Sequence, residues 1–191
     1  MEKFVYKHTL TYILLFVFGS SFCQKKYDQK TENSDLTLEG KSLKGYKTSF
    51  DFGREEVRKG WWKYAREFGS PLNMKSYYKV TIPSETTDGN VDLVIFTQTL
   101  DGNGGTDFFL GLENEKYREQ GLSMVLDFKK KFYINDLVKQ IDHKLDQSYS
   151  LSQQYRDEIL EDKKQELLDR ITSLEQEVEG LKDLIRMIEK G

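Results

Sequence analysis

The last quarter of the chain carries a heptad repeat of apolar residues, which restricts this segment to a helix that buries one narrow seam. Leucine or isoleucine recurs every seven residues, and β-branched residues stand three positions before the last three of them. The seam consists of Leu160, Leu167, Ile171, Leu174, Val178, Leu181, Ile185 and Ile188. β-Branched residues at a with leucine at d favour parallel two-stranded coiled coils. We therefore predict a coiled-coil tail over residues 148–191.

The charges that flank the seam agree with a parallel register. In a parallel pair Arg170 faces Glu175 and Glu177 faces Lys182, so both contacts attract. The tail then pairs with a second copy of the chain, giving a homodimer, or with a helical protein partner. A helix docked on its own domain and a solvated single helix are the alternatives, because the well-formed seam spans only about three heptads.

A continuous helix from residue 122 to residue 190 would be far longer than a small domain is wide. No proline follows Gly121, and the next glycine is Gly180. At 1.5 Å per residue such a helix measures about 100 Å, so the tail must project, pair with another chain or fold back. Three serines at positions 148–152 weaken the helical pattern, and the sequence leaves open whether the helix continues through them.

The first residues have the pattern of an export signal. Lys3 and Lys7 give a weakly basic start, an apolar core occupies positions 10–18, and small residues occupy positions 19–21. The core is too short for the roughly 20 residues that a membrane-spanning helix needs. We therefore predict export and a cleaved signal peptide over residues 1–23, with a retained anchor and a lipoprotein as alternatives.

The only cysteine lies at the predicted cleavage site. Ser21 and Cys23 supply small residues at −3 and −1, which places the new N-terminus at Gln24. Cleavage after Ser21, which leaves Phe22 first, is the second choice. Phe22 is bulky where a lipoprotein signal has a small residue directly before its cysteine, which argues against lipidation. The mature chain then holds no cysteine and no disulfide.

The middle of the chain has the pattern of one α+β domain. We predict a flexible lead-in over residues 24–34, followed by a domain over residues 35–147 that includes the start of the long helix. Period-two alternation predicts strands at 36–38, 46–52, 74–82, 91–100 and 108–112.

Residues 54–68 change to a helical period. Val57, Trp61, Ala65 and Phe68 form one apolar stripe, although Gly60 interrupts the pattern. Strands and helices in this order predict an α+β fold, with an antiparallel sheet of about five strands packed by helices and followed by a long C-terminal coiled-coil helix.

Two features resemble known exported proteins. The stretch SSFCQKK is similar to the ends of signal peptides in the Bacteroidetes and flavobacteria, where glutamine often begins the mature protein. A signal peptide, an α+β domain with a helix such as WWKYAREFG and a charged coiled-coil tail together resemble a group of uncharacterised exported flavobacterial proteins. The resemblance implies a Gram-negative envelope, in the periplasm or at the extracellular face, and it implies no activity.

Trp62 is the strongest candidate for a surface binding residue. It lies off the apolar stripe, and Arg58 and Arg66 stand one turn away on either side. Arginines stacked on an exposed indole would form a platform for a glycan or a partner. Burial of Trp62 under the C-terminal helix or an N-terminal strand is the structural interpretation, and we favour it over the platform.

The glycine-rich loop at positions 101–107 has acidic and amide oxygens at alternate positions, as a calcium loop does. Gly105 stands where a calcium loop has Asp or Asn, and Leu112 stands where it has a closing glutamate. A hairpin turn between two strands explains the glycines without an ion.

The residue types exclude several kinds of function. The formal net charge is −3, from 29 basic and 32 acidic residues, so no basic field attracts nucleic acid. Membrane contact is expected only through the signal peptide before cleavage. After cleavage His143 is the only histidine, so a zinc site or a serine or cysteine triad lacks its usual parts. We predict no catalytic residue, no metal and no cofactor, and a hydrolase that uses an acid pair such as Glu113 and Glu115 is the least favoured alternative.

The sequence therefore predicts an exported, non-enzymatic envelope protein that acts as an interaction or assembly module through its coiled coil. The alternative is a module of the cell envelope that binds a small ligand or a glycan with its sheet or an exposed tryptophan.

Overall fold

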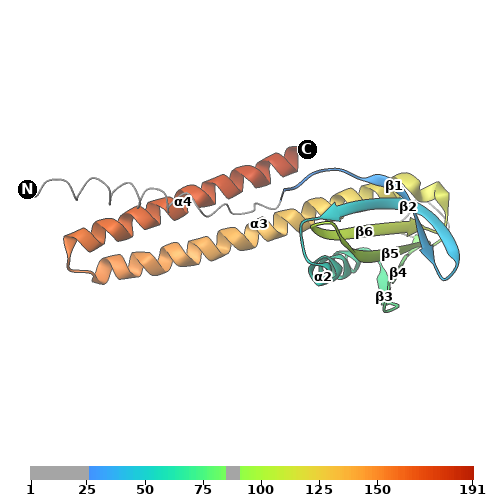
Figure 1. Cartoon of the computed structure of the whole chain (residues 1–191), viewed down its shortest axis with the longest axis horizontal. Coiled ribbons are helices and arrows are strands. Elements are labelled where there is room, and N and C mark those ends of the chain that lie inside the picture. The colour runs from blue at the N-terminus through green and yellow to red at the C-terminus, as the bar shows by residue number, and fades with distance from the viewer. Residues whose placement is uncertain (1–25, 85–90) are drawn as a thin grey trace, which may run out of the picture.

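The computed structural model describes residues 26–84 and 91–191 and has an α+β architecture (Figure 1). A six-stranded antiparallel sheet carries helices on one face, and a long helical hairpin extends beyond the sheet (Figure 1). The predicted α+β class is confirmed, but the sheet has one strand more than predicted. The predicted signal peptide, residues 1–23, lies outside the described residues.

The six strands and α2 come first along the described chain, and the two long helices follow them. The elements are β1 (Glu32–Leu38), β2 (Lys41–Phe50), α2 (Arg54–Ala65), β3 (Ser70–Asn73), β4 (Tyr78–Ile82), β5 (Leu93–Gly102), β6 (Gly105–Leu112), the 3-10 turn η2 (Glu115–Tyr117), α3 (Arg118–Asp157) and α4 (Glu161–Lys190). The strands lie in the order β1-β2-β6-β5-β4-β3, and every neighbouring pair is antiparallel. Strand β2 therefore lies beside β6, which leads directly into the long helices.

The strand that the sequence pattern missed is β3, at one edge of the sheet. It is four residues long and contains Pro71, which lies opposite Val80 of β4. Proline cannot donate a hydrogen bond to a neighbouring strand and is therefore confined to edges. Four residues that include a proline are too few to show a period-two alternation.

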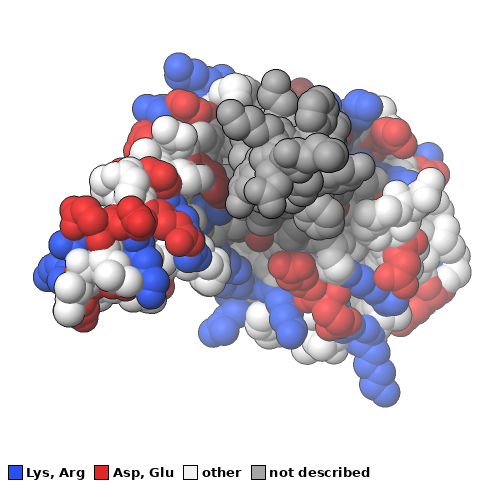
Figure 2. All heavy atoms as spheres, turned by 60° about the vertical axis from the view of Figure 1, so that its left-hand side comes forward, with Lys and Arg blue, Asp and Glu red and all other residues white. Residues whose placement is uncertain are grey.

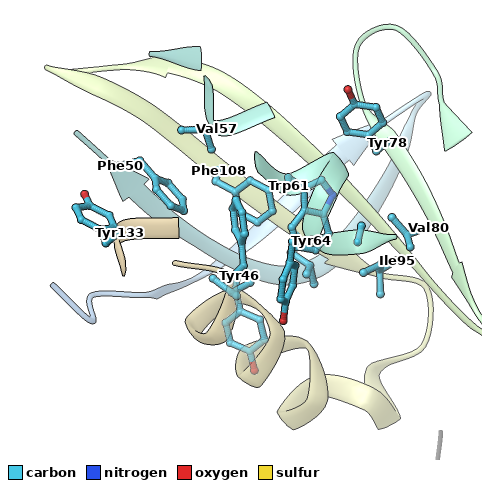
Figure 3. Packing of buried hydrophobic residues seen from close by; sticks show 14 of the residues in the cluster. Tyr46, Phe50, Val57, Trp61, Tyr64, Tyr78, Val80, Ile95, Phe108 and Tyr133 are labelled. Atoms are coloured by element: carbon cyan, nitrogen blue, oxygen red, sulfur yellow. The ribbon is translucent and has the colours of Figure 1, made fainter. Parts of the chain in front are cut away.

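The main core lies between the sheet and helices α2 and α3. Trp61, Phe108 and Phe128 come from α2, β6 and α3, and none is more than 1% exposed. The ring centroid of Trp61 lies 5.0 Å from that of Phe108 (Figure 3) and 5.1 Å from that of Phe128. The predicted stripe on α2 is confirmed, because Val57 and Ala65 are fully buried beside Trp61.

A second, smaller cluster lies on the opposite face of the sheet, under the β1–β2 hairpin. Leu36 of β1 is buried there with Tyr77, whose hydroxyl group donates a 3.0 Å hydrogen bond to Glu39 in the turn of the hairpin. Gly111 of β6 permits this contact, because a Cβ at that position would lie only 2.9 Å from the Cβ of Leu43. The hairpin therefore closes this part of the sheet to solvent.

Helices α3 and α4 form an antiparallel hairpin. Helix α3 continues without a break through the serines at 148–152 and ends at Asp157, so its 40 residues span about 60 Å. The chain reverses at residues 158–160, and α4 runs back along α3 to the domain (Figure 1). An ion pair between Lys144 and Glu177 joins the two helices midway, and Lys130 donates a 2.8 Å hydrogen bond to the carbonyl of Glu189 at the base.

The heptad seam packs against α3 of the same chain. Val178, Leu181 and Ile188 are buried within a single chain, and Leu181 and Ile188 belong to the main core. Leu160, predicted to open the seam, is 57% exposed at the turn. A parallel pair with a second chain is thus replaced by an antiparallel contact within the chain. The other seam residues, Leu167, Ile171, Leu174 and Ile185, are half-buried. The heptad pattern therefore indicates the face that α4 turns inward, but it does not say from which chain the covering helix comes.

Two predicted boundaries also differ from the structure. The predicted division between residues 147 and 148 falls inside α3, where the helix has no break. Strand β1 begins at Glu32, inside the segment 24–34 that was predicted to be a flexible lead-in. The described part of this segment is held by long-range contacts that the sequence pattern does not encode.

Candidate functional site

The half of the hairpin that extends past the domain, residues 142–180, is called the arm below (Figure 1). The arm contains eleven acidic and five basic residues, which gives it a formal charge of −6 against −3 for the whole chain. Acidic and basic side chains both reach its surface, which Figure 2 brings forward on the left. The chain therefore separates charge between an acidic arm and a nearly neutral domain.

Apolar side chains are also exposed on the arm. Five of the large exposed apolar residues lie there, namely Leu145, Tyr149, Ile159, Leu160 and Leu168. Ile159, at 88%, is the most exposed large apolar side chain among the described residues, and Leu160 follows it directly. The arm therefore ends in two adjacent apolar side chains at the point farthest from the core.

The turn that carries these two residues, residues 157–162, is called the tip below. The carboxylate of Glu158 accepts hydrogen bonds from the backbone N–H groups of Ile159 (2.9 Å) and Leu160 (3.0 Å). The bond from Leu160, and then the one from Ile159, holds the pKa of Glu158 below its usual value although burial opposes this. Asp157, Glu161 and Asp162 add further negative charge on either side. The tip is thus an ordered turn that combines apolar and acidic groups.

Leu160 occupies the N-cap of α4, where its side chain makes no capping hydrogen bond. Leucine is among the least favoured residues at this position, where Ser, Thr, Asp and Asn stabilise a helix by about 0.5–2 kcal/mol relative to an apolar residue. The residue at the cap is thus unfavourable for α4 and also contributes little to the core.

A cleft with a volume of about 560 Å³ lies between α2 and α3. Gly60 allows the two helices to approach, because a Cβ at that position would lie 2.3 Å from the Phe132 ring. This contact explains the glycine that interrupts the helical pattern of α2. The aromatic rings that line the cleft belong to Phe52, Tyr64, Phe128 and Phe132. The volume lies within the range typical of binding clefts.

Four lysines line the rim of this cleft, and one of them is paired. Lys131 lies 3.1 Å from Asp127 and 3.5 Å from Glu67, and the hydrogen bond to Asp127 is the main reason why its pKa is raised. The others, Lys59, Lys63 and Lys139, are exposed and have no acidic partner within 4.0 Å in the described part of the chain. Glu56 and Asp136 also line the cleft. One end of the cleft therefore offers free ammonium groups beside an aromatic surface.

The segment before β1, residues 26–30, is called the clasp below, because it binds across α3 and β2. Asp28 lies 2.5 Å from the Nζ atom of Lys129, a side chain that is 2% exposed. Lys129 also donates a 3.1 Å hydrogen bond to Thr48. The ring of Tyr27 packs edge-on against Tyr133 with centroids 5.4 Å apart. The predicted flexibility of this segment is wrong for its described residues, which neutralise a buried charge.

The contact with Lys129 also changes the pKa of Asp28. Burial opposes its ionisation, but the hydrogen bond and the charge of Lys129 outweigh burial and hold the pKa of Asp28 below its usual value. The sequence gives no direct signal for the pair, because Lys129 is one of three consecutive lysines and lies 101 residues from its partner.

The predicted platform of Arg58, Trp62 and Arg66 does not come together. Trp62 is half-buried and packs on Tyr78 with ring centroids 5.3 Å apart. Arg58 lies over the ring of Tyr78 at 5.1 Å and donates to its hydroxyl group at 3.0 Å. Arg66 is exposed at the end of α2. These residues join α2 to β4, which favours the structural interpretation.

The glycine-rich loop is the β5–β6 hairpin. Gly102 pairs with Gly105, and Gly104 adopts a φ of +90° in the turn between them. Asp107 forms a 2.9 Å ion pair with Lys47, and Asp101 lies 3.8 Å from Arg54. The hairpin interpretation is confirmed, because β5 and β6 pair on either side of this turn. Its two acidic side chains lie beside different basic side chains. Across residues 26–84 and 91–191 no group of three His, Cys, Asp or Glu residues is arranged to hold a metal ion.

Comparisons of the chain with protein-family models, with curated proteins and with solved structures found no match. In the part of the chain that the structure describes, no helix is both long and apolar enough to span a membrane. The tip, the cleft and the charge distribution are therefore the features of the molecule that bear on its function.

Proposed function

We propose that this chain is an exported, non-enzymatic assembly module of the cell envelope that binds another protein with the tip of its arm. The observation that carries this proposal is the pair Ile159 and Leu160, two exposed apolar side chains at the end of the arm. The signal pattern at the N-terminus supports export, and the resemblance to exported flavobacterial proteins supports the periplasm or the extracellular face.

The chemistry of the tip fits binding better than folding. Turns at a surface normally carry polar or small residues, which satisfy backbone groups and remain soluble. Here both apolar side chains lie outside the two core clusters, and Leu160 occupies a cap position that a polar residue would fill more favourably. Exposed apolar residues rimmed by polar ones are typical of protein-binding surfaces.

In this proposal the heptad seam does not bind the partner, as the sequence predicted, but joins α4 to its own chain. Because Leu181 and Ile188 are buried in the main core, the seam anchors the base of the arm to the domain and leaves the tip as the binding element. The partner can be a second copy of this chain or another protein.

A ligand-binding module remains the second candidate, because the cleft between α2 and α3 has a volume of 560 Å³ and aromatic walls. Its location differs from the sheet face and the tryptophan predicted from the sequence. The free lysines on its rim favour an acidic ligand.

Site-specific cross-linking in cells tests the proposed function. A photo-reactive residue at Glu161, which is exposed at the tip, is compared with one at Gln176, which is exposed on the middle of the arm. We expect a discrete cross-linked protein from position 161 and none from position 176. Equal capture from both positions, or no capture from 161, would contradict binding through the tip.

A further inference from the structure

We propose that the cleft between α2 and α3 receives the tip of a second copy, so that the chain associates head to tail. This inference rests on the proposed function, since it names the partner of the tip. The two surfaces are complementary in chemistry. The tip presents Ile159 and Leu160 between acidic residues, and the cleft presents Phe132 between lysines.

The charges favour this contact over a contact between two arms. Asp157, Glu161 and Asp162 supply the negative charge of the tip, although Glu161 lies 3.7 Å from Lys164, and Glu158 is occupied by its hydrogen bonds to the turn. The cleft supplies Lys59, Lys63 and Lys139, and the described residues bring no acidic group within 4.0 Å of them. Glu56, Glu67 and Asp136 also line the cleft, so its excess of positive charge is small and lies at these three lysines. Two arms of charge −6 would repel each other along their length. Opposite charge at the rim favours the docked orientation and accelerates encounter.

The geometry requires that the two surfaces come from different molecules. Lys139 lies at the base of the hairpin and Asp157 at its end, on the same uninterrupted helix. At 1.5 Å per residue they are about 27 Å apart along α3. A rigid helix holds this separation, so a tip cannot fold into the cleft of its own chain.

A contact between unlike surfaces also predicts the form of the assembly. A bound pair leaves one tip and one cleft unused, so further copies add to both ends unless a ring closes. The proposal therefore predicts oligomers that grow with concentration and that shrink as salt screens the lysines and carboxylates.

Charge reversal on each surface provides a test, because two variants that associate weakly alone should associate again when they are mixed. In the first variant, Lys59→Glu and Lys63→Glu make the cleft acidic. In the second, Asp157→Lys and Asp162→Lys make the tip basic. All four side chains are exposed and lie outside the core, so both variants should fold like the wild type. Their unfolding curves in urea confirm this before association is measured.

Sedimentation velocity over a range of concentrations then gives the result. We expect each variant alone to associate about tenfold more weakly than the wild type or worse, because like charges meet at the contact. An equimolar mixture should associate again, because each acidic surface then meets a basic one. A control with Lys41→Glu and Lys116→Glu, at exposed positions on other parts of the domain, should associate like the wild type.

The outcomes separate this inference from the proposed function. A wild type that stays monomeric up to hundreds of micromolar, or a mixture that does not associate, overturns head-to-tail docking. Capture of a different protein from position 161 in cells, with no capture of a second copy, overturns it as well but leaves binding through the tip intact. Cross-links from position 161 to Lys59 or Lys63 of another copy support it.

Discussion

Lys129 is the charged side chain whose burial matters most at the scale of single residues. Its ammonium group is enclosed by β2, α3 and the clasp, and Asp28 is the acidic group within ion-pair distance. A buried charge that loses its partner is strongly destabilising, whereas an apolar residue in place of the pair is often tolerated. The clasp therefore contributes to stability through one carboxylate as well as through the contact of Tyr27 with Tyr133.

Asp28→Asn should destabilise the domain by about 1–3 kcal/mol, because it leaves Lys129 buried with a weaker partner. We expect Lys129→Met to cost less and the double variant to be more stable than Asp28→Asn alone. Urea unfolding of all four proteins measures this coupling. Asp35→Asn, which removes an exposed pair with Lys44, is the control and should cost under about 1 kcal/mol. Additive effects of Asp28→Asn and Lys129→Met would show that the pair does not interact.

The same contact predicts a loss of stability in acid. Because the pKa of Asp28 is lower in the folded chain than its usual 3.8, its contribution is complete above that value. It disappears as the pH falls through the folded pKa, where the carboxylate gains a proton. The difference in unfolding free energy between wild type and Asp28→Asn should therefore shrink below about pH 4. A constant difference from pH 7 to pH 2 would exclude this explanation.

Among the elements, the two long helices show how far a heptad pattern can be interpreted. The seam correctly marks Val178, Leu181 and Ile188 as buried, but the covering helix is α3 of the same chain. Direction and partner were not predictable, because antiparallel and parallel pairs bury the same spacing of residues. The reversal at residues 158–160 contains neither glycine nor proline, so no turn signal marks it in the sequence. The side chain of Glu158 stabilises this turn by accepting hydrogen bonds from its backbone N–H groups.

The other elements were predictable where a local pattern specifies them and not predictable where contacts between distant residues do. Alternating strands and the stripe around Trp61 were predictable because each is visible within a short window of the sequence, twelve residues for the stripe from Val57 to Phe68. Strand β3 was not, because Pro71 hides its pattern. The clasp and the cleft were not either, since each brings together residues from segments far apart in the sequence. The tip was missed because Leu160 was assigned to the seam.

Leu181→Ala should lower the stability of the domain itself, because Leu181 is 5% exposed in a single chain and packs in the main core. The expected cost is about 2–5 kcal/mol. Leu168→Ala, on the same helix but 43% exposed, should cost under about 1 kcal/mol and is the matched control. Both values come from urea unfolding at a concentration where the chain is monomeric. Equal costs at the two positions would contradict the intramolecular hairpin.

At the scale of the whole molecule, the fold places an acidic arm on a domain of nearly neutral charge. The core anchors both ends of the hairpin, the arm carries its exposed apolar residues to the tip, and the cleft lies near the base. This separation of a projecting apolar tip from an aromatic cleft with lysines on its rim supports the proposal that copies or partners join end to end. The central claim is that the tip exists for binding and not for folding.

One variant, Ile159→Ser with Leu160→Ser, tests that claim most directly when stability and binding are measured together. Serine is a better N-cap than leucine, so the unfolding free energy should stay the same or rise by about 0.5–2 kcal/mol. Capture of a protein from the photo-reactive residue at position 161 should fall about tenfold or more, because the apolar contact is lost. A variant that is less stable but captures its partner as well as the wild type would contradict the account.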